Sequence, residues 1–116
     1  MKYMLLICSD PALYATPSGQ AMMPEILAKH RKLAEELTAA GVQWSGDRLQ
    51  SASSATTVRT DGSAQSLHDG PYAETKEELA GYYLIEAPDL DAAIAWARKI
   101  PMPGRGSVEV RPVVQM

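Results

Sequence analysis

The spacing of apolar residues predicts strands at both ends of the chain and two helices between them. Residues 3–8 form an uncharged run, which at this length is typical of a strand buried on both faces. After a loop at residues 11–19, apolar side chains recur at i, i+3, i+4 and i+7, as on one face of a helix. Pro24 suits the first turn of this helix, and Gly41 suits the position after its last turn. The apolar stripe consists of Met23, Ile26, Leu27, His30, Leu33, Ala34 and Leu37.

The middle of the chain predicts strands and tight turns. Residues 42–49 alternate between apolar and polar side chains, with a bend or bulge expected at Gly46 and Asp47. Residues 55–60 are rich in β-branched side chains and predict a third strand. The pair Asp61-Gly62 then predicts a hairpin that returns along residues 64–67.

The last third repeats the pattern of strand, helix and strand. Residues 80–87 predict a strand, and Asp89 is placed to cap a helix whose apolar stripe ends at Ile100. Residues 107–114 predict the final strand, although Pro112 fits poorly in a central strand. The order indicates one α+β domain over residues 1–116. We interpret it as a ferredoxin-like βαββαβ sandwich with an inserted hairpin.

This interpretation also predicts a homodimer. Two helices cover one face of such a sheet, yet residues 3–8 and 82–85 are apolar at consecutive positions. A large apolar sheet face is rarely left open in a soluble monomer, and a second copy related by a two-fold axis would cover it. The alternative is that residues 9–22 or the C-terminus fold over that face.

Composition narrows the classes of function. The net charge is −3 with no cluster of Lys and Arg, which argues against nucleic acid as a partner. No apolar stretch is long enough to span a membrane or form the core of a signal peptide, so we expect a cytoplasmic protein. The chain has one cysteine and two histidines without metal-ligand spacing, and no phosphate-binding or dinucleotide-binding motif. We therefore expect neither a metal nor a cofactor.

Four segments carry a resemblance to a known family. Residues 69–77 read DGPYAETKE and resemble the motif that names the DGPF-type proteins of the YCII-related family. Residues 79–86, residues 106–112 and the opening residues 1–7 are also similar to segments of that family. The sequence departs from the family at Tyr72, where phenylalanine is usual, and at Gln50-Ser51, where a proline is often found.

The resemblance implies a fold, an assembly and a setting. It implies a ferredoxin-like protomer in a dimeric α/β barrel with back-to-back sheets, and a bacterial protein often encoded near sigma factors. It supplies no established reaction. The broader family has been proposed to be enzymatic because of a His and Asp pair in a cleft, and His30 lies where that histidine would fall.

His30 and Asp69 are the candidate catalytic residues. A histidine within an apolar stripe can exchange a proton near neutral pH if a carboxylate orients it, or it can be a structural residue. Asp69 opens a Gly-Pro turn, where it either caps the turn or aims its carboxylate at His30.

Four further residues are candidate ligand-binding groups. Tyr72, Glu74 and Lys76 follow the Gly-Pro turn and either face a cleft or serve packing and a short helix that starts near residue 75. Arg111 shares one side of the last strand with Glu109, so it either binds a carboxylate or forms a salt bridge.

These residues leave three hypotheses about function open. The first is a metal-free acid/base enzyme that acts on a small polar molecule in a cleft between helix and sheet. The second is a non-catalytic ligand-binding or regulatory module linked to transcription through sigma factors. The third is a structural homodimer without a pocket, against which the polar motif at residues 69–77 argues. The fold alone does not choose among them.

Overall fold

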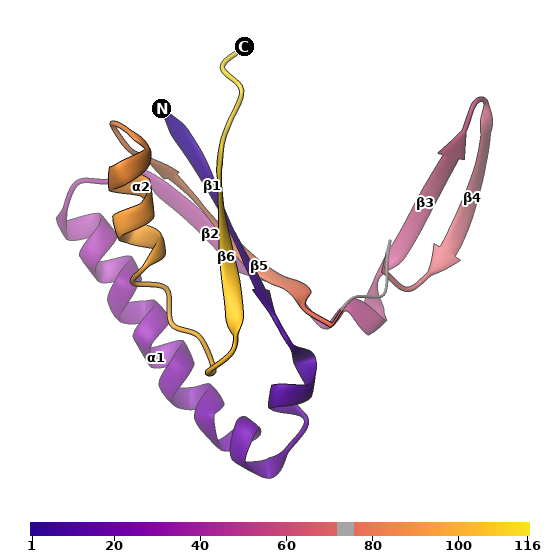
Figure 1. Cartoon of the computed structure of the whole chain (residues 1–116), viewed down its shortest axis with the longest axis horizontal. Helices are drawn as coiled ribbons and strands as arrows, with labels where there is room; N and C mark the ends of the chain where they lie inside the picture. The colour runs from indigo at the N-terminus through magenta and orange to yellow at the C-terminus, as the bar shows by residue number, and fades with distance from the viewer. Residues whose placement is uncertain (72–75) are drawn as a thin grey trace.

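The computed structural model describes residues 1–71 and 76–116 and has a mixed α+β architecture with antiparallel sheets (Figure 1). The strands are β1 (Lys2–Ser9), β2 (Trp44–Arg48), β3 (Thr56–Asp61), β4 (Ala64–Asp69), β5 (Glu78–Glu86) and β6 (Gly106–Pro112). The helices are α1 (Pro17–Ala39) and α2 (Leu90–Ala97), with short 3-10 turns η1 (Pro11–Tyr14) and η2 (Ala52–Ser54). The expected succession of strands, helices and hairpin is thus confirmed, with shifted boundaries.

Four strands form the main sheet, in the order β2-β5-β1-β6. Each neighbouring pair is antiparallel, and Leu5 of β1 lies opposite both Tyr83 and Val110. The β2–β5 register runs without a shift, so the bulge expected at Gly46 is wrong. Gly46 instead serves close packing, because a Cβ there would lie 2.7 Å from the carbonyl oxygen of Tyr82. Pro112 is tolerated because β6 is an edge strand.

Both helices cover the same face of the main sheet, and the hydrophobic core lies between the helices and the sheet (Figure 1). The odd-numbered side chains of β1 point toward the helices, and Leu5 is 1% exposed. α1 contributes Leu33 and Leu37, and α2 contributes Ala93. The core is formed by Tyr3, Leu5, Leu33, Leu37, Tyr83, Ile85, Ala87, Ala93 and Ile100.

Helix α1 begins six residues before the apolar stripe, which corrects the loop expected at residues 11–19. Thr16 is the N-cap, since its hydroxyl accepts a hydrogen bond from the backbone N–H of Gly19 at 3.1 Å. Pro17 occupies the first turn, where the missing N–H costs nothing. Pro24 therefore lies inside the helix and not at its start. Sequence periodicity missed this first section because its side chains are mostly exposed.

The chain turns after α1 and before α2 as the sequence predicts. Gly41 adopts a positive φ of 75° just beyond the end of α1, a conformation that glycine enters without strain. Asp89 caps α2, its carboxylate accepting a hydrogen bond from the N–H of Ala92 at 2.9 Å. Neither helix in the described part of the chain combines the length and apolarity needed to cross a bilayer.

The face of the main sheet away from the helices carries half-buried apolar side chains. Leu6 of β1 lies opposite Tyr82 of β5, and Met4 lies opposite Leu84. In the described part of this single chain, no helix covers these residues (Figure 1). The expectation of an apolar second face is therefore met.

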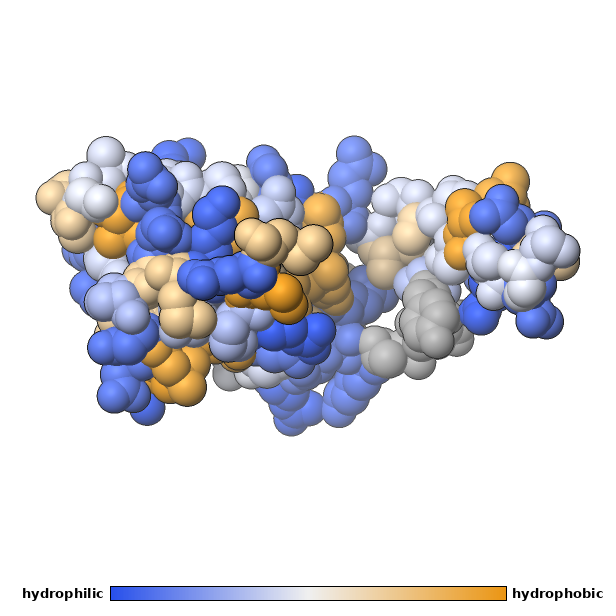
Figure 2. All heavy atoms as spheres, turned by 90° about the horizontal axis from the view of Figure 1, so that it is seen from above, coloured by the Kyte–Doolittle hydropathy of each residue, from blue (hydrophilic) through white to orange (hydrophobic). Residues whose placement is uncertain are grey.

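Strands β3 and β4 form a separate two-stranded sheet that stands apart from the main body (Figures 1 and 2). Asp61 pairs with Ala64 across a two-residue turn in which Gly62 has a φ of 62°. Val58 and Leu67 lie directly opposite each other and are 57% and 76% exposed. A lone two-stranded hairpin is only marginally stable in water.

Candidate functional site

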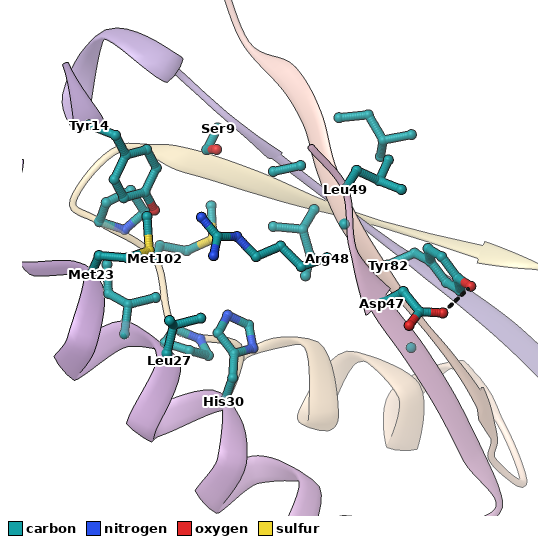
Figure 3. Close-up of a pocket in the computed structure, with 18 of the residues that line it drawn as sticks. Ser9, Tyr14, Met23, Leu27, His30, Asp47, Arg48, Leu49, Tyr82 and Met102 are labelled. Carbon is teal, nitrogen blue, oxygen red and sulfur yellow. Dashed lines mark hydrogen bonds between the residues drawn. The ribbon is translucent and has the colours of Figure 1, made fainter. Parts of the chain in front are cut away.

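A pocket of about 610 Å³ lies between α1 and the main sheet (Figure 3). Its volume is within the range that holds small-molecule ligands, roughly 300–1,000 Å³. Residues of α1, β2, β5, η1 and the loop before β6 surround it. Its apolar lining includes Ile7, Met23, Ile26, Leu27, Leu49 and Met102, and its polar lining includes Ser9, Tyr14, His30, Arg48 and Tyr83.

The residue spacing of α1 and of β2 places these side chains on the faces that line the pocket. Met23, Ile26, Leu27 and His30 recur at three- and four-residue spacing on the α1 face that meets the sheet. On β2 the alternate residues Trp44, Gly46 and Arg48 point to the same face, and their partners on β5 are Ile85, Tyr83 and Gly81. Arg48 therefore reaches the pocket from the end of a strand whose start contributes to the core.

His30 and Tyr83 form the central polar pair of the pocket. Nδ1 of His30 lies 2.7 Å from the hydroxyl of Tyr83, and the two rings stack with centroids 5.9 Å apart. Gly46 leaves room for this arrangement, because a Cβ at residue 46 would lie 3.1 Å from the Tyr83 ring. The hydrogen bond fixes the orientation of the imidazole and leaves Nε2 free of this contact.

The pocket favours the neutral form of His30. Burial lowers the pKa of His30 below 6.5, and the nearby Arg48 guanidinium lowers this pKa further. Burial also raises the pKa of the Tyr83 phenol, which therefore stays protonated. A neutral imidazole that is hydrogen-bonded to a phenol can accept or donate one proton near neutral pH.

The lowered pKa of His30 predicts a pH-dependent stability. Just below pH 6.5 the unfolded chain binds a proton at this histidine more readily than the folded chain does. The free energy of unfolding should therefore fall as the pH drops from about 6.5 to the folded pKa, and this residue should contribute no slope above that range. Urea unfolding at about pH 7.5 and about pH 5.5 should show a smaller decrease for His30→Gln than for the wild type. An equal decrease in both proteins would contradict the assignment.

The other predicted catalytic residue lies elsewhere in the chain. Asp69 is the exposed last residue of β4, in the separate hairpin, and it does not line the pocket with His30. Its backbone leads into Gly70, which has a φ of 107° and whose N–H donates to the carbonyl of Ala55 at 2.7 Å. A pairing of Asp69 with His30 would thus require a second copy of the chain, and it stays a prediction.

The predicted ligand-binding residues also fall outside the pocket or outside the described residues. Arg111 lies opposite Met4, on the sheet face away from the helices, and its guanidinium pairs with Glu109 at 2.6 Å. Lys76 is exposed at a bend before β5. Tyr72, Glu74 and the start of the expected short helix lie outside the described residues.

Three pocket residues were not predicted from the sequence as functional: Tyr14, Arg48 and Tyr83. Tyr83 was missed because a run of two tyrosines does not reveal which one faces the helix. A signal for Arg48 was present, since it continues the alternation of Trp44 and Gly46. Recognising it required knowing that this face of β2 meets His30.

Within residues 1–71 and 76–116, no three His, Cys, Asp or Glu side chains gather as metal ligands do. Burial, with Glu77 and Glu109 nearby, raises the pKa of the Cys8 thiol. A protonated thiol is a poor nucleophile at neutral pH.

Comparison with known sequences places the chain in a family. Residues 1–116 match the YCII-related domain. An uncharacterized protein of Rhizobium meliloti (strain 1021) is 35% identical over 118 residues, which cover 97% of this chain and 92% of that protein. The match spans both helices and all strands, so it concerns the whole fold described above. This chain therefore belongs to the family of proteins with a YCII-related domain.

Proposed function

We propose that the chain is an enzyme that binds a small molecule in the pocket between α1 and the sheet and transfers a proton to or from it through His30. The observation that carries this proposal is the 2.7 Å hydrogen bond between His30 and Tyr83 inside a ligand-sized pocket. A titratable group with a perturbed pKa in a concave, mostly apolar site marks a candidate functional site.

The pair can serve proton transfer in either direction. If Nδ1–H donates to the Tyr83 oxygen, Nε2 keeps its lone pair and acts as a general base. If the phenol donates to Nδ1, Nε2 carries the proton and acts as a general acid. The lowered pKa of His30 favours the neutral imidazole, which both tautomers share, so it does not choose between the two roles.

Paired variants of the two histidines test this proposal. The wild type, His30→Gln and His68→Gln would be incubated with a mixture of small metabolites, and substrate loss would be followed by mass spectrometry. His68 lies exposed on β4 outside the pocket and is the matched control. We expect turnover in the wild type and in His68→Gln, with a loss of about 100-fold or more in His30→Gln. Equal turnover in His30→Gln and the wild type would exclude a catalytic His30.

A non-catalytic ligand-binding module is the second candidate. The specific observation in its favour is that no carboxylate among the described residues hydrogen-bonds to the His30 ring, which contacts only Tyr83 in this way. Such a module would bind a ligand in the same pocket without converting it, and it could pass this signal to a transcription partner. Binding without turnover, weakened in His30→Gln, would favour it over the enzyme.

The strand order, the motif at residues 69–77 and the exposed surface support a ferredoxin-like member of the DGPF subgroup that forms a homodimer. The order β2-β5-β1-β6 with both helices on one face supports a ferredoxin-like fold, and residues 69–77 support the DGPF subgroup. The accessible surface is 8009 Å², against roughly 6,200 Å² for a compact monomer of 12.6 kDa. The difference in accessible surface area is larger than the roughly 800 Å² that each partner buries in a standard interface. These features support a homodimer with back-to-back sheets.

A charge on the open sheet face should separate such a dimer. Leu6 lies on this face opposite Tyr82 and Glu109. In sedimentation experiments we expect the wild type near twice 12.6 kDa and Leu6→Lys near 12.6 kDa. Leu90→Lys, on the exposed side of α2, should sediment as the wild type does. A monomeric wild type would contradict the proposed assembly.

A further inference from the structure

The Arg48 side chain occupies an unusual place for a surface cation. It reaches from the end of β2 across the pocket toward Tyr14, with His30 on the α1 side (Figure 3). Its cross-strand neighbour is Gly81, which has no side chain to fill the space. A Cβ at residue 81 would lie 2.9 Å from the Asp47 carbonyl oxygen and 3.4 Å from the Arg48 Cα. Gly81 therefore lets β2 approach β5 closely and leaves space beside the aliphatic part of the Arg48 side chain.

The charge of Arg48 has no anionic partner in the described part of the chain. None of the ion pairs found there involves it. Its sequence neighbour Asp47 points to the opposite face, where the Tyr82 hydroxyl donates to its carboxylate at 3.0 Å. Glu78, which also lines the pocket, has its carboxylate near the backbone N–H of Ala52 at 3.4 Å.

The guanidinium acts electrostatically on the two polar groups beside it. Burial lowers the pKa of His30, and the charge of Arg48 lowers it further. Burial raises the pKa of Tyr14, and the charge of Arg48 opposes that rise. The guanidinium thus lies close enough to influence any group that sits next to the imidazole. The surrounding wall is apolar and includes Met23, Leu27 and Met102. An uncompensated cation among apolar side chains favours a ligand with one anionic group and an apolar body.

We propose that the pocket selects a small carboxylic acid, with its carboxylate on Arg48 and its apolar body against the α1 wall. This inference rests on the proposed function and names the substrate class of the same site. Carboxylate is favoured over phosphate because its single negative charge matches the one guanidinium, with which it can form two parallel hydrogen bonds, whereas a phosphate monoester carries a charge of about −1.5 to −2. In this pose the carbon atoms next to the carboxylate lie beside His30, where a proton can be removed or added.

Calorimetric titration with matched acids and amides tests the inference. The probes are phenylacetate and hexanoate, with phenylacetamide and hexanamide as their neutral counterparts. The proteins are the wild type, Arg48→Met, Arg98→Met as the control on the exposed end of α2, and Arg111→Met. We expect both acids to bind the wild type more tightly than their amides. Arg48→Met should lose about 10- to 100-fold in affinity for the acids and little for the amides.

The comparison separates failure of this inference from failure of the proposed function. Arg98→Met should bind the acids as the wild type does. Equal binding of acid and amide, unchanged in Arg48→Met, overturns the carboxylate subsite while leaving a ligand pocket. Loss of acid binding in Arg111→Met but not in Arg48→Met overturns it in favour of the outer sheet face. If neither acids nor amides bind the wild type, the inference and the proposed pocket function both fail.

Discussion

Replacing Leu37 by alanine should lower the free energy of unfolding by about 2–5 kcal/mol, the range for buried leucines. Leu37 lies on α1 and is 1% exposed, within the core shared by both helices and the main sheet. The substitution removes apolar contacts and leaves a cavity that close-packed neighbours fill only in part. The expected fall in melting temperature is roughly 10 to 20 °C at matched protein concentration.

Leu90 supplies the matched control for this substitution. It is also a helical leucine, at the first position of α2, but it is 48% exposed. Leu90→Ala should change the free energy of unfolding by less than about 1 kcal/mol. Similar effects of Leu37→Ala and Leu90→Ala would mean that the core does not lie where α1 meets the sheet.

Replacing Gly19 by alanine should destabilise the protein, although alanine usually favours a helix over glycine by about 1 kcal/mol. Gly19 is buried in the first turn of α1 where η1 crosses it. A Cβ there would overlap the carbonyl oxygen of Leu13, which is a backbone atom and cannot rotate away as a side chain can. The clash must displace η1, at a typical overpacking cost of about 1–3 kcal/mol. Because η1 carries Tyr14, acid binding in the pocket should weaken as well.

Gln20→Ala is the control for this second substitution. Gln20 is the exposed neighbour in the same helical turn, so its replacement should be neutral or slightly stabilising. Thermal unfolding and calorimetric titration of the two variants give both readouts. A Gly19→Ala protein as stable as Gln20→Ala would show that η1 does not pack against α1 as described.

The sequence predicted most of the fold because its signals are local. The α1 stripe around Leu33 and Leu37, the cap at Asp89 and the hairpin turn at Gly62 each depend on residues within a few positions of one another. The start of α1 was missed because the Thr16 cap and Pro17 precede a section without an apolar stripe. The bulge expected at Gly46 was wrong because glycine in a strand also serves close approach of a neighbouring strand.

The candidate site could be predicted only in part, because it depends on register between distant segments. His30 was identified from its place in an apolar stripe. Its partner Tyr83 is 53 residues away, and only the pairing of β2 with β5 places Tyr83 and Arg48 on the face that meets His30. Asp69 belongs to the most recognisable motif, but Asp69 itself ends β4 of the separate hairpin. Membership of a recognisable motif therefore did not indicate that Asp69 lies near the pocket.

An NMR titration of labelled wild-type protein with phenylacetate, following backbone amides and the His30 ring, tests directly whether the pocket is the ligand site. We expect the largest shifts on His30, Arg48 and Tyr83 and their neighbours around the pocket, with the His30 ring signals moving along with them. Shifts confined to the β3–β4 hairpin or to the outer face around Arg111, with His30 unchanged, would contradict this expectation. They would place the binding site of this chain on a different surface.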